Sequence, residues 1–86
     1  MTSIEKVETE GEYIHVRFHD PDEFETIRTP DWAKDAAESI SDGAEVRTGK
    51  RTGSDDWETQ SVLIKKTVGE EKAREQAAEI YEKIEA

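Results

Sequence analysis

The few large apolar side chains of this chain follow strand spacing in its first and third quarters and helical spacing in its second and fourth. The clearest strand pattern runs over residues 13–19, where Ile14, Val16 and Phe18 alternate with polar or aromatic residues. Such alternation predicts a strand with one buried face, whereas apolar residues three and four apart predict a helix with one buried side. The signals together predict the order ββαββα.

Each pair of strands is predicted to form a hairpin. In the first, a turn at residues 10–11 contains a glycine, which adopts the positive φ that tight turns need, and Val7 lies opposite Ile14. In the second, placing Val46 opposite Val62 puts the apolar residues of both strands on one face.

The register of the second hairpin makes a further prediction about its tip. It sets Arg51 against Trp57 as a cation–π pair. By alternation, both of these side chains then point away from the buried face.

The first helix is predicted to begin at Thr29, as the N-cap, with Pro30 in the first helical position, and to run to about Ser41. Its apolar stripe predicts which side chains face the sheet. These are Trp32, Ala33, Ala36, Ala37 and Ile40. Trp32 is therefore expected to anchor this helix in the core.

The second helix is predicted to open with a capping box, because Thr67 is followed three residues later by Glu70. A regular apolar stripe follows, and its acidic residues lie on or beside the opposite side of the helix. The stripe consists of Ala73, Ala77, Ile80, Tyr81 and Ile84.

These elements predict a single α+β domain over residues 1–86. We expect a two-layer sandwich in which a four-stranded, mostly antiparallel sheet carries both helices on one face. Residues 24–28 are left open between a short strand and an ordered loop, because their pattern is weak.

The chain is strongly acidic, with 22 Asp and Glu residues against 12 Lys and Arg residues and a net charge of −10. Its apolar content of 33% is low. In composition, the chain resembles small acidic cytosolic proteins of halophilic archaea, whose surfaces are adapted to molar salt. This resemblance implies a salt-adapted cytoplasmic protein but no particular activity.

Several classes of site lack the residues that they need. The chain has no cysteine, which excludes disulfides, thiolate nucleophiles and cysteine-based zinc sites. No stretch approaches the ~20 apolar residues of a membrane span, and the N-terminus lacks a signal pattern, so a cytoplasmic protein is expected without membrane partners. His15 and His19 would stand about 13 Å apart along a strand, too far to share a metal ion.

No nucleophile elbow, phosphate-binding loop or calcium-loop pattern is present, so no catalytic residue, metal ligand or cofactor is predicted. The sheet face that points away from the helices is instead richer in aromatic and basic residues than the rest of the chain. The predicted partner-binding residues on this face are Tyr13, His15, Arg17, Arg47, Arg51 and Trp57.

Three functional hypotheses follow from this face. The first is a noncatalytic binding or assembly module that meets a protein partner or a second copy of itself. The second is binding of single-stranded RNA through the same face and the loop at residues 48–54, although the net charge opposes it. The third is a small enzyme whose site forms only at a dimer interface.

Overall fold

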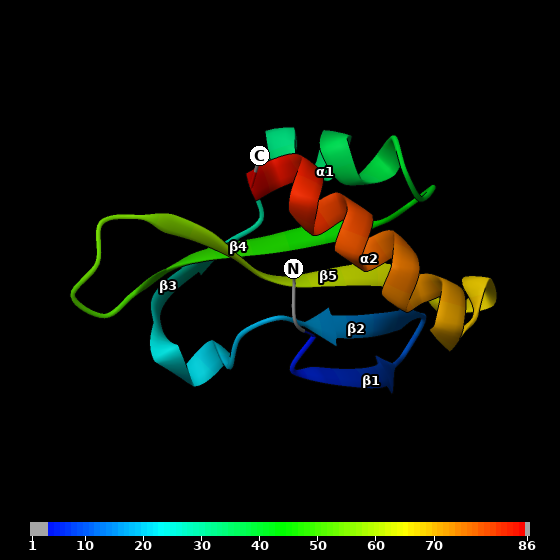
Figure 1. Cartoon of the computed structure of the whole chain (residues 1–86), viewed down its shortest axis with the longest axis horizontal. Coiled ribbons are helices and arrows are strands. Elements are labelled where there is room, and N and C mark those ends of the chain that lie inside the picture. Colours follow the sequence, from blue (N-terminus) through cyan, green and yellow to red (C-terminus); the bar gives the residue numbers. More distant parts are fainter. Residues whose placement is uncertain (1–3, 86) are drawn as a thin grey trace.

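The computed structural model describes residues 4–85 as a five-stranded antiparallel sheet with two α-helices packed on one face (Figure 1). The strands lie in the order β1-β2-β5-β4-β3. Their bounds are β1 Lys6–Glu10, β2 Tyr13–Arg17, β3 Phe24–Arg28, β4 Glu45–Arg51 and β5 Trp57–Lys65. The helices are α1 Asp31–Glu38 and α2 Glu70–Glu85, and 3-10 turns occupy Pro21–Glu23 and Lys66–Val68.

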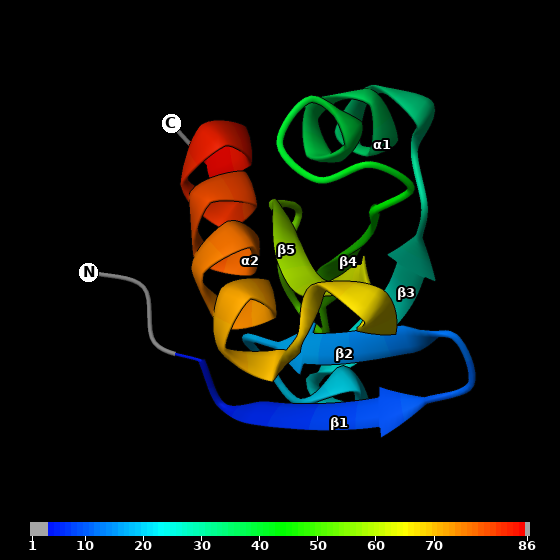
Figure 2. The same ribbon diagram turned by 90° about the vertical axis from the view of Figure 1, so that its right-hand side faces the viewer.

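The predicted α+β class with one antiparallel sheet is confirmed, but the predicted four strands and the order ββαββα are wrong. Residues 1–3 and 86 of the predicted domain lie outside the described residues. Within residues 4–85, no helix is long and apolar enough to cross a membrane. The sheet is twisted, so β1 and β3 at its two edges run in different directions in Figure 2.

The additional strand is β3, which pairs with β4 at one edge of the sheet. Phe24 at the start of β3 places its ring over Gly49 of β4. A Cβ at Gly49 would collide with that ring and would stand 2.7 Å from the carbonyl oxygen of Thr26. The absence of a side chain at Gly49 therefore makes room for β3, a requirement that the weak alternation of β3 itself does not reveal.

The core lies between the helices and the sheet. Val7, Val16, Val62 and Val46 stand directly opposite one another across four strands. The helices meet this row mainly through alanines, and Ala33, Ala37, Ala73 and Ala77 are fully buried. Because alanines let a helix approach the sheet closely, a chain with few large apolar residues still closes a continuous core.

The first hairpin differs from its predicted register. Its turn is formed by Gly11 and Glu12, so that Val7 pairs with Val16 instead of Ile14. Gly11 has the expected positive φ of 58°. Because a two-residue change in pairing keeps each side chain on its face, Val7 still points into the core.

The second hairpin contains a β-bulge. Val46 pairs with Val62 as predicted, but the ladder then skips Gln60, because Arg47 pairs with Ser61 and Thr48 pairs with Thr59. The bulge exchanges the two faces for residues 57–59 of β5, so that Thr59 and Trp57 point to the face opposite the one that regular alternation predicts. Its effect on the tip of the hairpin is that Lys50, and not Arg51, pairs with Trp57. The predicted pair of Arg51 with Trp57 is therefore wrong.

The start of α1 also differs from its prediction. The helix begins at Asp31, with Pro30 in an extended conformation as its N-cap, so Thr29 does not cap it. Trp32 is 58% exposed and does not anchor the core, whereas Ala33 and Ala37 are buried. Consecutive residues are separated by about 100° around a helix, so Trp32 lies beside the buried stripe.

In α2, the predicted stripe is confirmed. Ala73, Ala77 and Ile80 are buried, and Tyr81 and Ile84 pack against the core. The predicted capping box is wrong, because Thr67 belongs to the preceding 3-10 turn.

We expect Gly49→Ala to lower the free energy of unfolding by about 1–3 kcal/mol, because its methyl group would displace Phe24 and strain the β3–β4 pairing. Urea unfolding in molar KCl measures this. In a Phe24→Ala background the same substitution should cost less, since the ring is gone. Equal costs in both backgrounds would show that the ring does not depend on Gly49.

Candidate functional site

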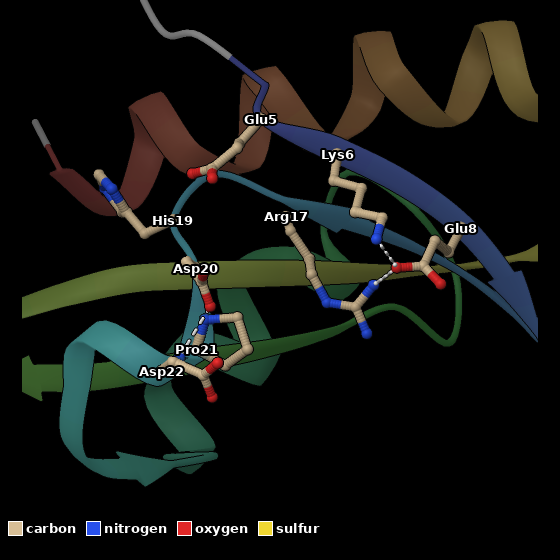
Figure 3. Close-up of a pocket in the computed structure, with 8 residues that line it drawn as sticks. All are labelled: Glu5, Lys6, Glu8, Arg17, His19, Asp20, Pro21 and Asp22. Carbon is tan, nitrogen blue, oxygen red and sulfur yellow. Dashed lines mark hydrogen bonds and ion pairs between the residues drawn. The ribbon is translucent and has the colours of Figure 1, made fainter.

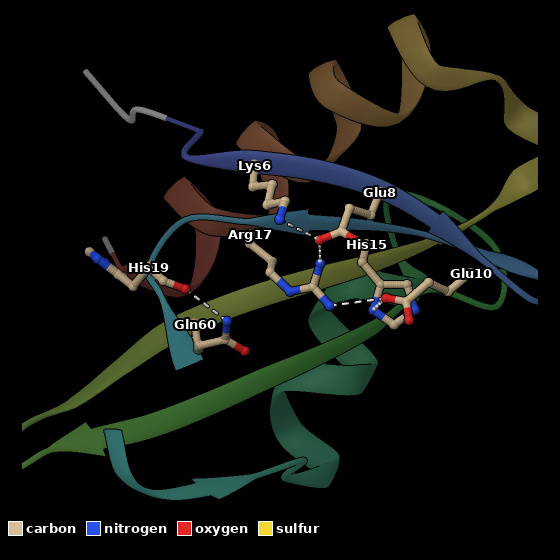
Figure 4. A network of polar contacts seen from close by, with 7 residues as sticks. All are labelled: Lys6, Glu8, Glu10, His15, Arg17, His19 and Gln60. Atoms are coloured by element: carbon tan, nitrogen blue, oxygen red, sulfur yellow. Dashed lines mark hydrogen bonds and ion pairs between the residues drawn. The ribbon is translucent and has the colours of Figure 1, made fainter. Parts of the chain in front are cut away.

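The sheet face away from the helices, here called the open face, holds five of the six predicted binding residues, with Arg51 at the far end of β4 from the other four. Tyr13, His15 and Arg17 reach it from β2, and Arg47 reaches it from β4. Arg17 is already bound by two carboxylates. Its Nη1 donates to Glu8 over 2.8 Å and its Nη2 donates to Glu10 over 3.0 Å (Figure 4). The hydrogen bond from Arg17 lowers the pKa of Glu10.

His15 is also largely covered on this face, with 9% of its surface exposed. Burial lowers the pKa of His15 below its ordinary value of 6.5, and the nearby carboxylate of Glu10 opposes this shift only in part. Its Nδ1 lies 3.9 Å from an oxygen of Glu10. The open face is therefore covered by its own polar side chains, and of the five predicted residues Arg47 is the most exposed.

Arg51 is placed away from those four residues. Its Nη2 lies 2.7 Å from Nδ1 of His19, and its Nε lies 3.1 Å from an oxygen of Glu58. Its guanidinium also stands over the ring of Phe24. Arg51 thus belongs to a polar cluster, in which the carboxylate of Glu58 neutralises its charge.

Trp57 is not on the open face, and its predicted placement there is wrong. Because of the bulge at Gln60, Trp57 and Thr59 point to the side of the sheet that carries the helices. There Trp57 lines a groove together with residues from the end of β3 and the start of α1. We call this site the tryptophan groove, and it consists of Arg28, Pro30, Trp32, Thr48 and Trp57.

The tryptophan groove has a volume of about 250 Å³ and two exposed aromatic walls. Trp32 is 58% exposed and Trp57 is 42% exposed, the two largest side chains of the chain. Pro30 holds the connection from β3 to α1 in an extended conformation. The buried Thr48 donates a hydrogen bond of 3.4 Å to the carbonyl of Arg28, which ties β4 to the end of β3.

Positive charge is concentrated at Trp57. The guanidinium carbon of Arg28 and the Nζ of Lys50 each lie 5.4 Å from the centroid of its ring. Among the described residues, neither cation forms an ion pair with a carboxylate. The groove therefore offers aromatic surface and the positive charge of Arg28, and Lys50 adds a second positive charge beside it, in a chain whose net charge is −10.

A larger cavity of about 380 Å³ lies between β1, β2 and the turn that follows β2 (Figure 3). Its cations are already paired, because Lys6 and Arg17 both contact Glu8, at 3.2 Å and 2.8 Å. Its other wall carries acidic residues of the turn, where Asp20 accepts a hydrogen bond from the amide of Asp22. Any ligand would have to displace these internal contacts, so we favour the tryptophan groove as the site.

His15 and His19 lie at opposite ends of the network in Figure 4. Within residues 4–85, no three His, Asp or Glu side chains come together in the way that ligands of one ion do.

Sequence reasoning selected Trp57 but missed Arg28, Pro30 and Trp32. For Trp32 a signal was present, because its position one residue before Ala33 and Ala37 places it at the border of the buried stripe. For Arg28 there is none, since its place in the groove depends on β3 being a strand that pairs with β4 and on the bulge that turns Trp57 to the same side.

Neither protein-family models nor curated proteins nor solved structures give a match to this chain.

The buried His15 should make stability depend on pH. Its pKa is lower in the folded chain than in the unfolded chain, so the unfolded chain binds the proton more readily. The stability that neutral His15 contributes is present near pH 7 and is lost as the pH falls below about 6.5. We expect His15→Gln to flatten the dependence of unfolding free energy on pH between about pH 5 and pH 7.

Urea unfolding at several pH values in molar KCl tests this expectation. His19→Gln is the matched control, because it retains the contribution of His15. A slope unchanged by His15→Gln would contradict the burial of this imidazole.

Proposed function

We propose that this protein is a noncatalytic binding module and that its recognition site is the tryptophan groove. The observation that carries the proposal is that both tryptophans of the chain line one groove and are exposed, Trp32 at 58% and Trp57 at 42%. Tryptophan and arginine are the residues most enriched where binding energy is concentrated. The side chains of the groove supply aromatic surface, positive charge and one hydroxyl, which suit binding.

The proposal moves recognition from the open face, where the sequence suggested it, to the opposite side of the sheet. On the open face, Arg17 and His15 are held by Glu8 and Glu10. Binding there would first have to break those contacts. Arg28 in the groove and Lys50 beside it both lie over the ring of Trp57, and a ligand can contact both without displacing a carboxylate.

The energy that the rings can supply is limited. Covering the exposed parts of both indoles would bury on the order of 200 Å² of apolar surface, which corresponds to ~5 kcal/mol at ~25 cal/mol per Å². Association itself costs about 4 kcal/mol or more. Stacking alone therefore gives weak binding, and a tight ligand must also use the cations.

A groove built on stacking suits a protein adapted to high salt, which the acidic composition suggests and which we retain as part of the proposal. Interactions between exposed charges are screened within about 3 Å in molar salt. Burial of aromatic surface is not weakened by that screening. If the partner is a second copy of the chain that covers the same two rings, the protein functions as an assembly module; we call this alternative the assembly form.

We expect Trp32→Ala and Trp57→Ala each to change the free energy of unfolding by less than about 1 kcal/mol, because the rings are exposed. The matched control is Ile80→Ala, which empties a buried position and should cost about 2–5 kcal/mol. Urea unfolding in molar KCl measures all three.

A loss comparable to that of Ile80→Ala at either tryptophan would contradict the proposal, because the ring would then be a structural element. Sedimentation velocity on the same samples identifies the assembly form. A wild-type dimer that becomes a monomer in Trp57→Ala would show that the groove binds a second copy.

A further inference from the structure

The cations at the tryptophan groove differ from Arg17 and Arg51 in what they contact. Arg17 and Arg51 are both held by carboxylates. Within the described residues, Arg28 and Lys50 have no such partner and lie against the ring of Trp57 instead. The groove is therefore complementary to a ligand that is both flat and negatively charged.

A single-stranded nucleic acid has this chemistry in every residue, because each nucleotide joins an aromatic base to a phosphate. Proteins that bind single strands stack bases on aromatic side chains and contact the phosphate backbone with Lys and Arg. In a duplex the bases are stacked on one another and paired, so they would not reach the rings of Trp32 and Trp57.

We propose that the tryptophan groove binds single-stranded nucleic acid. A base stacks on the exposed indole surface, and the adjoining phosphates lie near Arg28 and Lys50. This inference rests on the proposed function and identifies its ligand. The hairpin of β4 and β5 projects beyond the helices in Figure 1, and it carries both Lys50 and Trp57.

The net charge of −10 shapes how such binding must depend on salt. In most complexes with single strands, the logarithm of affinity falls with the logarithm of salt by about 0.7 for each phosphate neutralised. Here only two cations face the strand, and the acidic remainder of the chain repels it. Added salt screens that repulsion, so we expect affinity to stay level or rise between low and molar KCl.

The test is a titration of the full chain with a short oligouridylate, followed by the fluorescence of tryptophan. Because both tryptophans line the groove, the signal reports on this site alone. We expect saturable quenching by the oligouridylate in molar KCl, no quenching by a duplex of the same length, and an affinity that does not fall as KCl is raised. An unchanged signal, or a steep loss of affinity with salt, would overturn the proposal.

Variants locate the binding. Arg28→Gln leaves both rings in place and should weaken binding about threefold or more, and Trp57→Ala should weaken it about tenfold or more, as expected for the loss of one stacked base. Arg47→Gln is the matched control, because it removes an exposed arginine of the open face. Equal effects of Arg28→Gln and Arg47→Gln would overturn the assignment to the groove.

Failure of this proposal can be told apart from failure of the proposed function. If a polyglutamate peptide quenches the tryptophans as strongly as the oligouridylate, or if only self-association depends on Trp57, the groove binds protein and the nucleic-acid proposal is overturned. If neither probe acts and both tryptophan variants are as unstable as Ile80→Ala, the groove is structural and both proposals are overturned.

Discussion

The arrangement of the site depends on one extra residue in β5. Gln60 forms a bulge that reverses which residues of this strand face the helices, so that Trp57 joins Trp32 on the same side of the sheet. The bulge is held firmly, because the carbonyl of Gln60 accepts hydrogen bonds from the amides of Phe18 and His19, at 2.9 Å and 3.3 Å. Its side-chain amide also donates to the carbonyl of His19 over 2.8 Å. Without it, the two tryptophans would lie on opposite faces.

The aliphatic side chains of the chain fill the core, whereas its two tryptophans line the groove. The space between sheet and helices is filled by valines, isoleucines and alanines, which allow close packing with little volume. Both tryptophans, the largest side chains available, are left at the border of this layer with much of their surface in water. A chain so poor in apolar residues gains no folding energy from that exposed surface, and this is why we assign it to binding.

Much of the fold could be predicted from periodicity, and the candidate site could not. The alternation in β2, the stripe of α2 and the pairing of Val46 with Val62 are dictated by the need to bury one face. The bulge has no such signal, because Gln60 and its neighbours contain no glycine or break in pattern. Periodicity alone therefore predicts the wrong face for Trp57 and gives no reason to connect Arg28 with it. The sequence of β3 alone is ambiguous, because this strand can pair with β4 only where Gly49 leaves room for the ring of Phe24.

The most direct measurement of the central claim is the set of nuclear Overhauser effects from the indole protons of Trp57 in labelled protein at molar KCl. The bulged ladder places this ring beside the side chains of Arg28 and Lys50, so effects to both are expected. In a regular ladder, Trp57 would instead lie opposite Arg51. Effects from the indole to Arg51, with none to Arg28, would contradict the bulge and the groove that it builds.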